Sequence, residues 1–230
     1  MLHTWAAVFG LEESAHFEDD VTACVVALRQ EIDFARLRLT AQGVPDDLTQ
    51  TGFSRLKGTA SVGYFHTNWH SHRGNIQPPE NRLAFAWAAW VLRDEDETTM
   101  SADALSSLRA EIVSLEQSLE ETELSPYLRD FIQRQLDTIR AALRVYGVQG
   151  ARPLKEAIEK VAGAYALDKP MLDSEVGKEM EAGKGLVSRT GDILRQTAEV
   201  CGNAEKIVSF GEKVTSFGVS AGTLLLGLIK

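Results

Sequence analysis

The stretch between Arg55 and Arg82 gathers residue types that could bind a ligand. Aromatic rings able to stack on a nucleobase lie there among cations able to pair with phosphates, in a chain whose net charge is −9. The candidate ligand-binding residues are Arg55, Lys57, Tyr64, His66, Trp69, His70, His72, Arg73 and Arg82. Two interpretations are open: a pocket for a nucleotide or short oligonucleotide, or a structured loop whose rings cover a helical bundle.

Three of the five histidines, His66, His70 and His72, fall within seven residues. On a helix, His66 and His70 would share a face and could hold zinc, but His72 would point elsewhere. The helical metalloprotease pattern needs Glu after the first histidine, and Thr67 stands there instead. We therefore predict no metal site.

Enzyme signatures are weak in this chain. The run from Gly177 to Gly185 resembles a P-loop only loosely, because five residues separate its first two glycines and Gly185 replaces the hydroxyl that would bind Mg²⁺. The carboxylate pairs lie on expected surface faces of helices, where solvation is their usual role. We predict no enzymatic activity and no cofactor.

The C-terminal segment 203–230 carries a different signal. Its apolar residues are spaced alternately by three and four, as in one stripe of a helix or a heptad seam. The seam comprises Ile207, Phe210, Val214, Phe217, Ala221, Leu224 and Leu228, with Gly218 and Gly222 forming a G-x-x-x-G pair beside it. The sixteen residues 214–229 carry no charge. They would make roughly 24 Å of helix, slightly less than a bilayer core of about 30 Å.

The glycines of this segment bear on its environment. Each of Gly211, Gly218, Gly222 and Gly227 would cost about 1 kcal/mol relative to alanine in an exposed soluble helix. In lipid, small residues let helices approach closely. Two interpretations follow: a helix that inserts in a membrane or lines a pore, or one that closes a soluble bundle or joins an oligomer.

The composition limits the partners and the compartment. Of the 230 residues, 44% are hydrophobic and 25% charged, an ordinary globular balance, and the pI of about 5.1 argues against bulk nucleic-acid binding. The first residues lack the basic region of a secretory signal, and Cys24 and Cys201 are isolated, as reduced thiols would be. We expect a cytoplasmic protein, associated with the inner membrane through its C-terminal helix in the membrane interpretation.

The apolar spacing elsewhere predicts an all-α fold, a helical bundle. A helix is expected over 18–42, and another from Pro79 with its apolar positions at Leu83, Ala84, Trp87, Trp90 and Val91. Two further helices, capped by Ser101 and by Ser125-Pro126, should form an antiparallel hairpin that stops at Gly147.

A change of composition suggests two domains. Nine of the 18 glycines fall between Gly177 and Gly227. We expect a helical domain over 1–169, with an aromatic and His-rich loop at 58–78. A Gly-rich helical region over 170–230 would follow it and either oligomerise or meet a membrane, with the boundary near Pro170.

A helical domain followed by an apolar tail resembles, in the order of its parts, the bacterial anti-phage (toxin-like) membrane effectors. The resemblance implies a sensing domain that holds a hydrophobic tail in check until a signal, often a nucleotide, arrives. We expect an oligomeric effector whose released C-terminal helix forms a membrane pore or channel, controlled by a ligand at the N-terminal domain. Its partners would be its own copies, membrane lipid, and a nucleotide or short oligonucleotide. The alternatives are a soluble helical scaffold that oligomerises through the same seam, and a nucleotide- or oligonucleotide-binding regulator.

Overall fold

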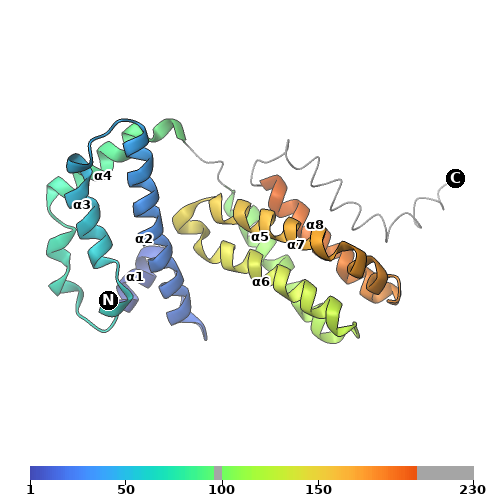
Figure 1. Ribbon diagram of the computed structural model, residues 1–230. Helices are drawn as coiled ribbons and strands as arrows, with labels where there is room; N and C mark the ends of the chain where they lie inside the picture. The colour runs from blue at the N-terminus through green and yellow to red at the C-terminus, as the bar shows by residue number, and fades with distance from the viewer. Residues whose placement is uncertain (96–99, 201–230) are drawn as a thin grey trace. The chain divides into compact units, whose positions relative to one another are not determined.

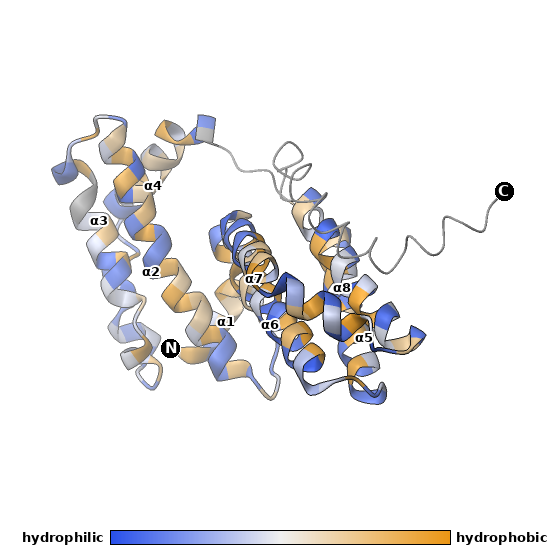
Figure 2. Ribbon diagram, turned by 45° about the vertical axis from the view of Figure 1, so that its right-hand side comes forward, coloured by the Kyte–Doolittle hydropathy of each residue, from blue (hydrophilic) through white to orange (hydrophobic). Residues whose placement is uncertain are grey.

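The computed structural model describes residues 1–95 and 100–200, and within these ranges the chain is all-α, with no strand (Figure 1). Polar and apolar residues are interleaved along the long helices, as amphipathic helices require (Figure 2). The fold divides into two compact units. Of the described residues, the first comprises 1–95 with Gly147–Gly150, and the second 100–146 with 151–200.

The first unit contains four α-helices and several short 3₁₀ turns. Its elements are α1 (Leu2–Phe9), α2 (Phe17–Ala41), α3 (Asp46–Thr59), η1 (Val62–Tyr64), η2 (Trp69–Ser71), η3 (Arg73–Asn75), α4 (Pro79–Val91) and η4 (Arg93–Glu95). Gly10 and Gly43 follow α1 and α2 with φ of 66° and 80°, a conformation that side chains with a Cβ rarely adopt. The expected helix 18–42 is therefore confirmed as α2, to within one residue at each end.

Two apolar clusters hold this unit together. Trp5, Val21 and Val25 are buried where α1 packs on α2, together with Phe65 from the loop after α3. Further along α2, residues including Ile32 and Leu39 pack with Phe53 of α3 and Ala88 of α4. Cys24 is buried on α2. Cys201 lies outside the described residues.

The described residues of the second unit form four long helices around one core. They are α5 (Ala102–Glu121), α6 (Pro126–Gln149), α7 (Arg152–Val176) and α8 (Glu181–Val200). Ser101 caps α5 as predicted, since its side chain accepts a hydrogen bond from the backbone N–H of Ala104 at 3.1 Å. The buried residues include Leu108, Ile112, Leu115, Leu128, Ile132, Leu136, Ile139, Leu154, Val161, Leu172, Leu186, Val187 and Ile193.

The predicted antiparallel hairpin is confirmed as α5 and α6. Arg140 of α6 forms an ion pair with Glu116 of α5. Arg129, near the start of α6, donates to the carbonyls of Leu119 and Thr122 at 2.6 and 2.8 Å. These contacts join the end of one helix to the start of the next, as an antiparallel pair requires. The hairpin does not stop at Gly147, however: α6 continues to Gln149, and Gly150, with φ of 64°, follows it.

The two compact units divide the chain at a different place from the expected domains. Pro170 lies inside α7, and Leu172 and Leu186, on either side of the α7–α8 turn, are buried in the core that α5 and α6 also form. The glycine-rich composition therefore changes within one packed unit. The observed division falls instead between Glu97 and Thr98. Gly183 and Gly191 lie within α8 and are buried, so a glycine-rich composition is compatible with a packed helix here.

Candidate functional site

The two candidate cations on α3 have different surroundings. The Lys57 ammonium lies 2.6 and 2.5 Å from the carboxylate oxygens of Asp33 on α2. Arg29, one turn earlier on α2, donates from Nη1 to the carbonyls of Lys57 and Ala60 at 2.5 and 2.9 Å. These bonds satisfy carbonyls that the end of α3 leaves without helical partners. Lys57 therefore joins α2 to α3, whereas Arg55 is exposed.

The loop after α3 is fixed to the start of the chain. The amino group of Met1 donates to the carbonyls of Phe65 and Thr67 at 3.0 and 2.7 Å. Phe65 is buried, and Trp69 is half-buried against the same apolar cluster. The tryptophan predicted to stack on a base thus contributes to packing, which is the other role the sequence left open for this loop.

The three clustered histidines do not share one environment. The Thr67 hydroxyl donates to the Tyr64 carbonyl at 2.7 Å, so its oxygen accepts the hydrogen bond from Nε2 of His72 at 2.9 Å. The rings of Tyr64 and His72 also lie against each other, with centroids 4.5 Å apart. His66 and His70 are exposed. Within the described part of the chain, no three His, Cys, Asp or Glu side chains are grouped so that they could hold a metal ion.

The remaining candidate cations, Arg73 and Arg82, are both exposed. Arg73 opens η3, and Arg82 lies on the first turns of α4. The buried Asn81 connects these elements, since its side-chain amide donates to the carbonyl of Asn75 at 2.8 Å. Asn81 also lies against Gly52, so α3, η3 and α4 form one continuous part of the unit. Arg55, Arg73 and Arg82 are thus exposed cations on elements that pack together.

Helix α4 exposes three of its five predicted apolar positions. Leu83, Trp87 and Trp90 are 71%, 37% and 61% exposed. Val91, in contrast, packs in the core with Ala88 and Phe85. All nine residues 83–91 are apolar, so the period of the sequence gives no direction to the core. Because every position of this run is apolar, the sequence does indicate that α4 is apolar on its exposed side as well as on its packed side.

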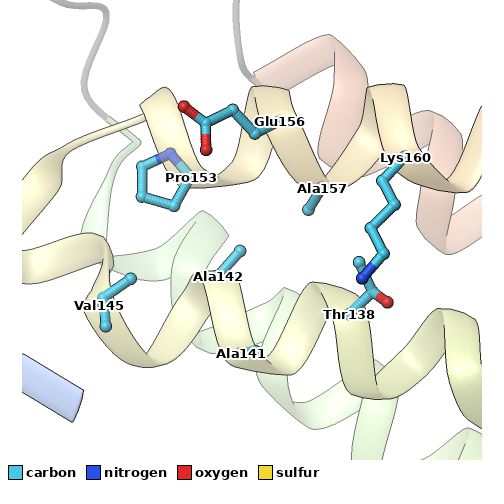
Figure 3. Close-up of a pocket in the computed structure, with 8 residues that line it drawn as sticks. All are labelled: Thr138, Ala141, Ala142, Val145, Pro153, Glu156, Ala157 and Lys160. Carbon is cyan, nitrogen blue, oxygen red and sulfur yellow. The ribbon is translucent and has the colours of Figure 1, made fainter. Parts of the chain in front are cut away.

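A shallow pocket of about 270 Å³ lies between α6 and α7 in the second unit (Figure 3). Its lining is mostly small and apolar, with Ala141, Ala142 and Val145 on α6 facing Pro153 and Ala157 on α7. Thr138, Glu156 and Lys160 supply its polar groups. This pocket contains none of the predicted ligand-binding residues.

The predicted membrane or oligomer helix, Ile207 to Leu228, lies outside the described residues. None of the helices within residues 1–95 and 100–200 combines the length and apolar character that crossing a bilayer requires. A further pattern in the segment was missed: Gly218-Val-Ser-Ala-Gly222 fits G-x-S-x-G, the turn that carries a nucleophilic serine in some hydrolases. That chemistry needs a strand directly before the turn. The residues before Gly218 lie outside the described part of the chain.

The comparisons with known proteins add no relative. No family model, no curated protein and no solved structure matches this chain.

Proposed function

We propose that this chain is an oligomeric helical effector whose C-terminal helix forms a membrane pore when released. The seam from Ile207 to Leu228 would join copies of the chain. Thr215, Ser216, Ser220 and Thr223 would line a polar path or bond between helices. The N-terminal unit would hold or release this segment in response to a ligand.

One observation carries the proposal: a well-filled helical core is followed by a long uncharged apolar run. The core of α5–α8 is built from buried side chains of all four helices. Among the described residues of this unit, the large apolar side chains that remain exposed are few: Val113 on α5, Leu167 and Met171 one turn apart on α7, and Met180 before α8. So few exposed apolar residues are ordinary for a protein surface. The described unit therefore presents no broad apolar face that a further seven-residue seam would be needed to cover.

Dye release from lipid vesicles tests the proposal. Three samples are compared: the full chain, a chain ending at Gly202, and the peptide 203–230. We expect the peptide to release dye, and the full chain to do so once its C-terminal segment is freed from the N-terminal unit. The shortened chain should release no dye. Leu224→Asp, which places a charge on the seam, should abolish release, whereas Glu205→Ala, outside the seam, should leave it unchanged.

Size measurement with and without detergent separates the effector from a scaffold. A full chain that forms a soluble oligomer, stays out of the vesicle fraction and loses the oligomer on truncation at Gly202 would identify a scaffold that uses the same seam. In that case neither the full chain nor the peptide would release dye, and the pore proposal would be wrong.

A nucleotide-binding regulator is the second candidate, favoured by the exposed cations Arg55, Arg73 and Arg82 and by the exposed Tyr64 ring in the same unit. Nucleotides or short oligonucleotides titrated against Trp fluorescence test it. Binding that weakens in Arg73→Ala and in Trp69→Ala would support it. A signal that neither substitution changes would place the ligand elsewhere.

A further inference from the structure

Helix α4 is apolar on two sides, and only one of them is packed. Its inner side contributes Phe85, Ala88 and Val91 to the core of the first unit. The outer face is formed by Leu83, Trp87 and Trp90, at positions i, i+4 and i+7 of one helical stripe. Exposed tryptophans are costly to leave in water, since each can bury roughly 150–250 Å². This outer face is therefore expected to have a partner.

The size of the outer face limits what that partner can be. The stripe spans two helical turns, roughly 10 Å. A stable protein–protein interface buries about 800 Å² on each partner, whereas three partly exposed side chains offer a few hundred. The lipid interface is different, because a few tryptophan and leucine side chains inserted at headgroup level already give measurable, reversible binding.

The charges on α4 and on the elements packed with it indicate the kind of lipid that would be bound. From Leu48 to Arg93 the sequence has five cations, Arg55, Lys57, Arg73, Arg82 and Arg93, and one acid, Glu80, within a chain of net charge −9. Lys57 is paired with Asp33. The Arg93 guanidinium lies 4.5 Å from the Trp90 ring centre and 3.7 Å from a carboxylate oxygen of Asp94. Arg55, Arg73 and Arg82 are exposed on the packed elements α3, η3 and α4.

The acidic run 94–97 begins directly after the cation-rich segment that ends at Arg93. These four acids would repel an anionic lipid surface. Contact with lipid must therefore be made by the earlier turns of α4 and by the arginines of α3 and η3. Tryptophan and leucine beside arginine is the side-chain combination of an interfacial helix, which attracts anionic headgroups electrostatically.

We propose that the outer face of α4, with Arg55, Arg73 and Arg82, docks the first unit on an anionic lipid surface. The inference deepens the proposed function, since it gives the N-terminal unit its own membrane contact beside the C-terminal segment. It does not require that segment to form a pore.

Tryptophan fluorescence of the full chain tests this proposal directly. All four tryptophans precede residue 91, so the C-terminal segment contributes no signal. Trp5 is buried and Trp69 half-buried, which leaves Trp87 and Trp90 as the reporters open to lipid. Vesicles of phosphatidylglycerol and phosphatidylcholine with brominated acyl chains should quench this emission, and pure phosphatidylcholine vesicles should quench it far less. The quenching should disappear in the Trp87→Phe, Trp90→Phe variant.

Substitutions on the outer face separate its apolar and charged parts. Leu83→Asp should weaken the quenching-detected binding at least tenfold, because a carboxylate would enter the apolar interface. Arg55→Ala and Arg82→Ala should each weaken it about fivefold, the loss expected for one cation near an anionic surface. Leu167→Asp, an equally drastic change at an exposed position of α7, should have no effect. These positions are exposed, so circular dichroism should show that all variants remain folded.

The outcomes distinguish this proposal from the pore. Vesicle binding without tryptophan quenching would mean that the C-terminal segment binds alone, which overturns this proposal and leaves the pore intact. Quenching without dye release would support the docking surface and count against the pore. Quenching of equal strength on uncharged vesicles, or a self-associated chain that Leu83→Asp converts to a monomer without any lipid signal, would overturn the anionic docking surface.

Discussion

The ammonium group of Lys57 lies between the two carboxylate oxygens of Asp33, at 2.6 and 2.5 Å. The pair joins α2 to α3 across 24 residues of sequence. A lysine expected from its neighbours to meet a phosphate therefore has a partner within the fold. Of the cations expected at the ligand site, Arg55, Arg73 and Arg82 are the exposed ones.

This pair should contribute little to stability. The Lys57 and Asp33 side chains are about one-third and one-half exposed, so water and salt screen their attraction. A double-mutant cycle with Lys57→Met and Asp33→Asn, measured by urea denaturation, should give a coupling energy of about 0.2–1 kcal/mol. The coupling should fall as salt is added. A salt-independent coupling of several kcal/mol would contradict this assignment.

Arg29 should matter more to the fold than the exposed arginines do. Its guanidinium donates to two carbonyls at the end of α3, and Arg29→Ala would leave both without that donor. We expect a loss of about 2 kcal/mol, the scale of hydrogen bonds made by a charged donor. Arg55→Ala, at an exposed position on α3, is the matched control and should change the unfolding free energy by less than about 0.5 kcal/mol. Equal losses in the two variants would show that the Arg29 bonds do not stabilise α3.

Local signals predicted the helices of this chain well, and longer-range features poorly. Ser101 and the three-four spacing of Leu108, Ile112, Leu115 and Leu119 are sufficient to place α5 and its buried face, because cap and period act within a few turns. The pairing of Lys57 with Asp33 depends on how α2 packs on α3. It could not be predicted, because the sequence of either helix alone does not determine that packing.

Two other features could not be predicted, for different physical reasons. The sequence does not show which side of α4 is buried, because its apolar run has no period. Pro170 lies within a continuous helix, because a helix can contain proline where tertiary packing holds both sides, as Tyr165 and Leu172 do in α7. The aromatic and His-rich loop, in contrast, was recognised from its irregular composition, and η1, η2 and η3 occupy it.

Gly52 of α3 faces Ala84 and Asn81 of α4. A Cβ at this position would lie 3.4 Å from the Cβ of Ala84 and 3.6 Å from Oδ1 of Asn81, an ordinary contact distance. Gly52→Ala should therefore fit and raise stability by up to about 1 kcal/mol through helix propensity. Gly52→Leu has no room beyond Cβ and should cost about 1–3 kcal/mol by forcing the helices apart. Thermal denaturation of both variants checks this. A leucine variant as stable as the alanine variant would show that α4 moves away without cost, and that it is weakly held on α3.

The end of α6 offers a test with two glycines three residues apart. Gly147 lies within the helix with nothing within 4 Å of an added Cβ, so Gly147→Ala should raise the unfolding free energy by about 1 kcal/mol. Gly150 follows the helix with φ of 64°, where a Cβ is strained, so Gly150→Ala should lower it by about 1–2 kcal/mol. Urea denaturation of the two variants should therefore show midpoints on opposite sides of the parent chain. If instead Gly147→Ala were the destabilising change, the helix would end at Gly147, as its sequence first suggested, and the last turn of α6 would have to be redrawn.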